Sequence, residues 1–144
     1  MPAFAASTRR IAYWIITSIV ALETGAGGIM DLLRTQHVRM VVTQLGYPLY
    51  LLTILGFWKI PGAMVLFTRR FPRLQEWAYA GIFFEMSGAA VSHAFVHDPG
   101  YMTITVTFAL LTLASWMLRP PDRVPGAAAG TWPVTSARPH ASVW

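Results

Sequence analysis

The stretch from Leu74 to His97, LQEWAYAGIFFEMSGAAVSHAFVH, constrains the fold more than any other part of the chain. Its 24 residues are mostly apolar or small, and a helix of this length can cross a hydrocarbon layer of about 30 Å. Glu85 lies at its centre. A charged side chain there costs about 2.5–3.5 kcal/mol on insertion scales unless it is compensated. The stretch therefore predicts a membrane span that takes part in a polar site.

Composition supports the membrane class. Hydrophobic residues make up 55% of the 144 residues and charged residues 12%, whereas soluble domains carry about 25% charged residues. The net charge of +5 comes from arginines beside the apolar runs. Arginines at such positions are typical of residues that orient a protein in the membrane, so no nucleic-acid partner is predicted. The chain has no cysteine, so disulfides, thiolate metal sites, iron–sulfur clusters and dithiol redox chemistry are excluded.

The apolar pattern predicts an all-α integral membrane four-helix bundle. A short interfacial helix is expected between spans 1 and 2, within residues 31–47, with Thr35 as its N-cap and Gly46 as its stop. Glycines in the first span are typical of a close approach between helices. The expected segments are a cytoplasmic N-terminal segment (1–10), four spans (11–30, 48–68, 74–97 and 101–118) and a disordered cytoplasmic tail (119–144).

Basic residues predict the orientation. The positive-inside rule places a multi-pass protein in the cell membrane with both termini in the cytoplasm. Arg34 and Arg39 fall on the opposite side, and Lys59 lies within a span. The expected cytoplasmic residues are Arg9, Arg10, Arg69, Arg70, Arg73, Arg119, Arg123 and Arg138.

Three ionisable residues from three predicted spans lie at similar depths. At 1.5 Å per residue, Glu23 is about 18 Å, Glu85 about 16 Å and Lys59 about 14 Å from the cytoplasmic boundary. One lysine can pair with only one of the two glutamates, so the other is expected to hold a proton. This predicts a catalytic or binding site, although a buried pair that only fixes helix register remains the alternative.

Further polar and aromatic residues surround this level. Ser92 and His93 lie towards the outer end of the third span, so His93 is predicted to relay protons to Glu85. His37, His93, His97 and Asp98 together could in principle bind zinc or copper, but their spacing is no recognised ligand pattern and no metal is predicted. Three residues are candidates for lining a pocket for a flat lipophilic molecule, namely Trp58, Phe84 and Ser92. The sequence does not indicate which cofactor, if any, the protein binds.

Two segments resemble the DoxX-like family of small four-helix membrane proteins. They are LGYPLYLLTILGFWKIPGA (45–63) and RFPRLQEWAYAGIFFEMSGAAVSHAFVHDP (70–99). The family takes its name from a subunit of a thiosulfate:quinone oxidoreductase, so the resemblance implies a quinone-linked or oxidoreductase-associated membrane subunit. Asp31 stands where relatives commonly have a lysine, and Glu23 is also unusual, which suggests a specialised polar pocket.

Three functions stay open at this point, and the sequence does not decide whether the chain is an enzyme. The first is the DoxX-like accessory role in the bilayer, with a quinone or a redox partner subunit. The second is an isomerase, cyclase or epoxide hydrolase on a lipophilic substrate, with Glu85 or Glu23 as general acid, Lys59 orienting it and His93 relaying protons. The third is a proton-coupled transporter, which would need a homodimer.

Overall fold

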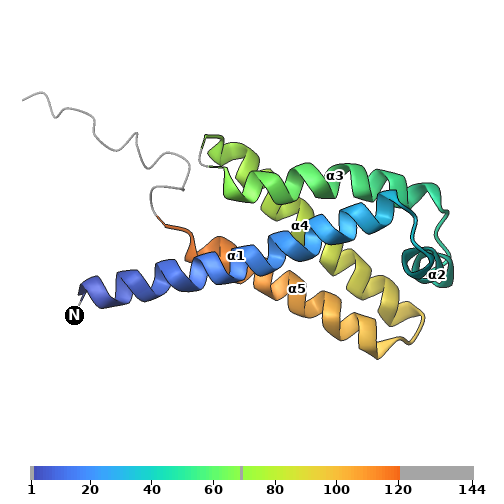
Figure 1. Ribbon diagram of the computed structural model, residues 1–144. Coiled ribbons are helices and arrows are strands. Elements are labelled where there is room, and N and C mark those ends of the chain that lie inside the picture. Colours follow the sequence, from blue (N-terminus) through green and yellow to red (C-terminus); the bar gives the residue numbers. More distant parts are fainter. Residues whose placement is uncertain (1, 69, 121–144) are drawn as a thin grey trace, which may run out of the picture.

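The computed structural model describes residues 2–68 and 70–120. Within these residues the fold is all-α, as predicted, with five helices and no strands (Figure 1). The predicted disordered tail lies outside the described residues from position 121 onwards. The helices are α1 (Pro2–Leu32), α2 (Gln36–Gln44), α3 (Tyr50–Phe67), α4 (Pro72–Phe95) and α5 (Pro99–Leu118).

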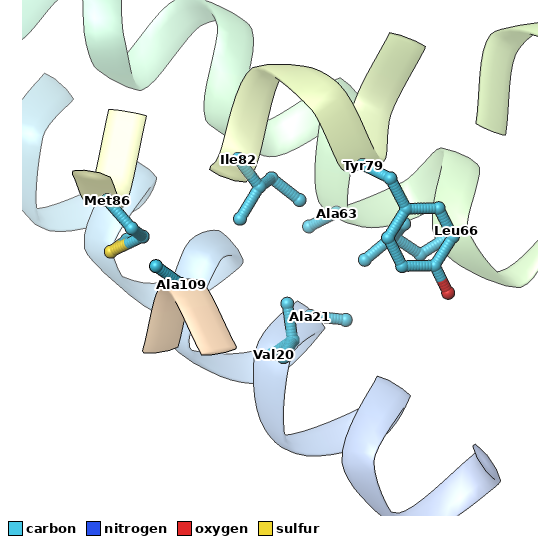
Figure 2. Close-up of a cluster of buried hydrophobic side chains, with 8 residues drawn as sticks. All are labelled: Val20, Ala21, Ala63, Leu66, Tyr79, Ile82, Met86 and Ala109. Carbon is cyan, nitrogen blue, oxygen red and sulfur yellow. The ribbon is translucent and has the colours of Figure 1, made fainter. Parts of the chain in front are cut away.

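The four long helices pack in two principal pairs. α1 packs along α3 and α4 along α5, while contacts of α1 with α5 and of α3 with α4 join the pairs. The short α2 lies at the end where α1 finishes and α3 begins (Figure 1). One apolar cluster receives side chains from all four long helices (Figure 2). Its buried members are Val20, Ala21, Ala63, Leu66, Tyr79, Ile82, Met86 and Ala109.

Membrane-spanning character is clear for three helices. In the described part of the chain, Ser7–Leu32, Tyr50–Phe67 and Pro99–Leu118 are long and apolar enough to cross a membrane. The sequence predicted four spans, and α4 is not among these three. Its 24 residues suffice in length, but Gln75, Glu76 and Glu85 lower its mean hydropathy.

The first helix is longer than predicted. It begins at Pro2 and not near residue 11, so most of the expected N-terminal segment is helical. Proline is favoured in the first turn of a helix, and the following residues include three alanines, which favour helix formation.

The turns around α2 and α5 are closed by local contacts. Gly46 has φ +79°, and the Tyr47 amide donates to the Val42 carbonyl at 3.0 Å, which confirms the predicted stop. Thr35 precedes α2 as expected, but its side chain makes no capping hydrogen bond. Before α5, Asp98 accepts a hydrogen bond from the amide of Tyr101 at 3.2 Å.

Two glycines set the distance between α1 and α3. A Cβ at Gly28 would lie 2.7 Å from the Cβ of Lys59, and a Cβ at Gly56 would lie 2.7 Å from the Gly28 carbonyl oxygen. Neither position has room for a side chain. The close approach expected of the glycines in the first span is therefore present at Gly28, and it places α1 directly against Lys59.

Candidate functional site

Lys59 lies between two carboxylates from different helices. Its Nζ is 2.7 Å from Oε1 of Glu85 on α4 and 3.0 Å from Oδ2 of Asp31 on α1. The side chains of Lys59, Asp31 and Glu85 are only 11%, 6% and 21% exposed. Opposite charges that are this close and this shielded from solvent interact more strongly than a surface ion pair.

Glu23 lies near the triad formed by Lys59, Asp31 and Glu85, but it does not belong to that triad. Among the described residues, Lys59 forms ion pairs with Asp31 and Glu85 and not with Glu23. A Cβ on Gly27 would lie 3.6 Å from Nζ of Lys59 and 3.7 Å from Oε1 of Glu23, so both charged atoms border the same small space. Glu23 accepts one long hydrogen bond, of 3.5 Å, from the Thr24 hydroxyl.

All four ionisable side chains border one cavity of about 460 Å³. This volume is within the range of small-molecule sites. Much of the remaining wall is apolar, and α2 contributes to it from one end of the molecule. The apolar wall includes Val38, Val41, Leu52, Leu55, Met86 and Ile104.

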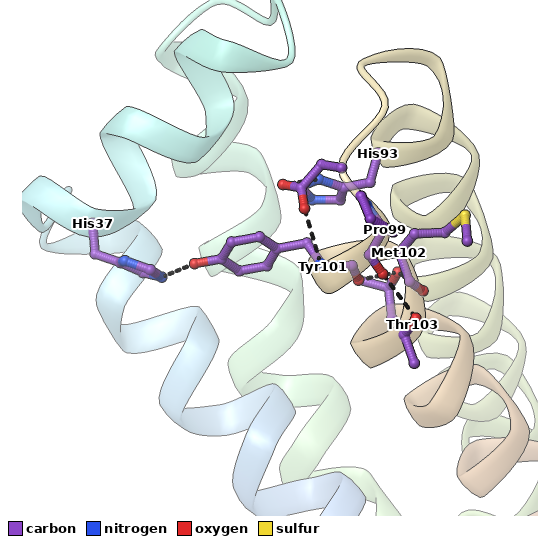
Figure 3. A network of polar contacts seen from close by, with 8 residues as sticks. His37, His93, Pro99, Tyr101, Met102 and Thr103 are labelled. Carbon is purple, nitrogen blue, oxygen red and sulfur yellow. Dashed lines mark hydrogen bonds and ion pairs between the residues drawn. The ribbon is translucent and has the colours of Figure 1, made fainter.

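A second polar group lines the same cavity near α2. His93 is buried, and its ring stacks on Tyr101 with centroids 5.1 Å apart and an interplanar angle of 15°. Nδ1 of His93 lies 3.4 Å from Oδ2 of Asp98 without a hydrogen bond in the described chain. The Tyr101 hydroxyl reaches across to Nε2 of His37 on α2, at 3.1 Å (Figure 3).

The remaining predicted residues near His93 have different surroundings. Ser92 lines the cavity, donates to the Gly88 carbonyl at 2.9 Å and shares a 2.9 Å hydrogen bond with the Tyr47 hydroxyl. His97 is exposed and has φ +56°, which turns the chain towards α5. The part of the chain that the structure describes contains no group of three His, Cys, Asp or Glu residues suited to a metal ion.

The aromatic pocket candidates do not share one site. Phe84 borders the cavity although its side chain is largely exposed, whereas Trp58 is 68% exposed and does not line it. Trp58 lines a separate groove of about 420 Å³ together with Trp77 of α4, and that groove also touches Lys59 and Glu85. The predicted grouping of Trp58 with Phe84 and Ser92 is therefore corrected, because Trp58 projects from the outer face of α3.

Two residues of this site were not among the predicted site residues, namely Asp31 and Tyr101. The family resemblance connects Asp31 with a specialised polar pocket, but the sequence does not predict its ion pair with Lys59. A usable signal for Asp31 was its acidic side chain directly at the end of a predicted span. For Tyr101, the short turn after His93 already requires α5 to begin beside that histidine.

Comparison with known proteins agrees with this architecture. A model of the DoxX-like family matches residues 15–115, which is well over half of the 144 residues. No curated protein and no solved structure matches the chain. The family match and the three apolar helices together indicate a membrane protein. The chain belongs to the DoxX-like family.

Proposed function

We propose that this DoxX-like protein binds a lipophilic small molecule inside the membrane, with the polar group of that molecule at Lys59 and Glu23. The observation that carries the proposal is the cavity of about 460 Å³ on which Glu23, Asp31, Lys59 and Glu85 converge. Its apolar wall suits a hydrocarbon skeleton, and the ionisable residues supply a few oriented polar contacts. This combination is typical of small-molecule sites.

The proposal includes a membrane topology of four spans. α4 is the fourth, because its polar side chains have partners within the protein. Glu85 pairs with Lys59, and the Gln75 amide donates to the Leu66 carbonyl at 3.0 Å. Such pairing removes much of the cost of polar groups at membrane depth. The distribution of basic residues then favours the cell membrane, with both termini in the cytoplasm.

Each site residue has a role in this proposal. Lys59 donates to an acceptor on the ligand, while Asp31 and Glu85 hold its ammonium in place. Glu23, which is not paired with Lys59, accepts from a donor on the ligand. A quinone is a neutral member of this ligand class, since its carbonyl oxygens could accept from Lys59.

Acid–base catalysis on the bound molecule is a second candidate, favoured by the arrangement at His93. A buried imidazole that faces a carboxylate at 3.4 Å and lines the ligand cavity is oriented for proton transfer. In this version Glu23, which is not paired with Lys59, gives a proton to the substrate, and His93 exchanges protons with the outer side. The binding function does not depend on this step.

The test is native mass spectrometry of the protein extracted in lipid nanodiscs, followed by identification of any retained lipophile. Gly27→Leu is expected to abolish retention, since a Cβ fits at Gly27 and the rest of the side chain would fill the space beside Lys59. Gly81→Leu is the matched control, because Gly81 lines only the outer groove and has no neighbour within 4 Å. Equal retention by the two variants, or no retention by the wild type, would contradict the proposal.

A further inference from the structure

The charge of the cavity narrows the class of ligand. Its lining contains three carboxyl groups, from Glu23, Asp31 and Glu85, and one ammonium group, from Lys59. With these four groups ionised and with His37 and His93, which also line the cavity, neutral, the formal charge is −2. Coulomb interactions are strong where water is scarce, so a carboxylate or phosphate headgroup would be repelled. A positively charged group would bring the cavity closer to neutrality.

Glu23 is the carboxylate that can take such a group. The other two carboxylates already contact Lys59, at 3.0 Å for Asp31 and 2.7 Å for Glu85. Glu23 lies outside these ion pairs, and the absence of a side chain at Gly27 leaves open the space that its Oε1 borders. A ligand ammonium in that space would complete a second ion pair beside the Lys59 triad.

A second polar group lies at the other end of the cavity. His93 is 4% exposed and lines the cavity, and its Nδ1 faces Oδ2 of Asp98 at 3.4 Å without a hydrogen bond in the described chain. Glu85 and His93 are eight residues apart on α4, about 12 Å along the helix, so the cavity offers an apolar wall between two polar ends.

We propose that the ligand is a lipophilic amine, bound in its protonated form with the ammonium at Glu23 and its hydrocarbon body extending along the apolar wall towards His93. This inference rests on the proposed function, because it assumes that the cavity holds a lipophilic molecule. It adds that the ligand is positively charged and that Glu23 is the residue that binds this charge.

The experiment compares three probes of nearly equal shape on the full chain in nanodiscs. They are phenylbutylamine, phenylbutanol and phenylbutyrate, which carry a positive, a neutral and a negative end. Binding is measured by isothermal titration calorimetry, with empty nanodiscs subtracted. The wild type is expected to bind the amine about tenfold more tightly than the alcohol and to bind the carboxylate most weakly.

Two variants assign this preference to Glu23. Glu23→Gln is expected to reduce amine affinity about tenfold and to leave alcohol affinity unchanged, whereas Glu23→Asp keeps the preference for the amine. Glu76→Gln is the matched control, since Glu76 lies outside the cavity and pairs with Arg119. Elution volume and circular dichroism report folding, and the wild-type ranking alone tests the proposal if Glu23→Gln does not fold.

The outcomes separate the two proposals. If the alcohol binds and Gly27→Leu abolishes its binding, but the amine is not preferred, the inference about charge is wrong and the lipophilic site stands. If Glu23→Gln keeps the full amine preference, the assignment to Glu23 is wrong. If none of the three probes binds to the wild type, both proposals are overturned.

Discussion

Lys59 balances two carboxylates that would otherwise lack a counter-charge in a nearly dry site. Asp31 and Glu85 lie 3.0 and 2.7 Å from its Nζ, and breaking a buried ion pair costs more than forming it gains. The stability of this site therefore depends on the three residues together. A change at Lys59 should be far more harmful than a change at an exposed arginine.

The first prediction concerns this triad. Lys59→Met should lower the free energy of unfolding by about 3 kcal/mol, because two buried carboxylates lose their partner. Adding Glu85→Gln should restore at least about 1 kcal/mol, since one uncompensated charge is then removed. Thermal unfolding in detergent, followed by circular dichroism, measures both effects. A double variant no more stable than the single one would show that the two residues act independently.

A second prediction concerns a buried hydroxyl group in the other half of the molecule. Ser115 shares hydrogen bonds of 2.7 Å with Thr17 and 2.9 Å with Tyr79, and all three residues are buried. Ser115→Ala should destabilise the protein by about 1 kcal/mol, because the buried hydroxyl groups of Thr17 and Tyr79 each lose one hydrogen bond. The same unfolding assay measures it, with Ser87→Ala as the control, because within the described residues the Ser87 hydroxyl bonds only the Phe84 carbonyl of its own helix. Equal stability of the two variants would contradict the packing described.

At the scale of elements, the contact between α1 and α3 depends on glycine. Gly28→Ala would place its Cβ 2.7 Å from the Cβ of Lys59, so the helices must move apart. We expect a loss of about 1–3 kcal/mol together with weaker ligand retention. Gly27→Ala meets only ordinary contacts, of 3.6 and 3.7 Å, and is the matched control. If both variants unfold at the same temperature, this close approach does not determine stability.

The positions of the elements explain how far the site could be predicted. Counting residues along each span placed Glu23, Lys59 and Glu85 at similar depths, and the structure brings Lys59 to Glu85. The ion pair of Lys59 with Asp31 was not predicted, because backbone depth ignores the reach of lysine's flexible four-carbon stem. Trp58 was assigned to the pocket from its neighbour Lys59, but adjacent residues on a helix lie on different faces.

At the scale of the whole molecule, the helical fold and the family were predictable, and the number of spans was harder to fix. Mean hydropathy treats every polar residue as a cost, so α4 does not qualify as a span. In the structure, polar residues of α4 have partners outside α4: Glu85 pairs with Lys59 of α3, and Glu76 accepts from Trp116 of α5 and from Arg119, at 2.7 and 2.6 Å. The mean hydropathy of a single segment cannot include hydrogen-bond and ion-pair partners that other helices supply.

The proposed topology gives the fourth prediction. The chain has no cysteine, so single cysteines introduced at exposed positions report their side of the membrane without background. In intact cells, Arg39→Cys on α2 should react with a membrane-impermeant maleimide, and Arg70→Cys in the turn before α4 should react only after permeabilisation. The reverse pattern would invert the topology. Labelling of both in intact cells would remove α3 as a span.

The central claim is that the cavity at Lys59 holds a lipophilic molecule within the membrane. Its most direct test is photo-crosslinking of the nanodisc-embedded protein with a diazirine derivative of phenylbutylamine, followed by mapping of the labelled peptides. The account predicts labels on cavity-lining segments of α1 and α4, around Gly27 and Ala89, which excess unlabelled amine suppresses. Labels confined to the outer groove at Trp58 and Trp77, or labels that excess amine does not suppress, would contradict it.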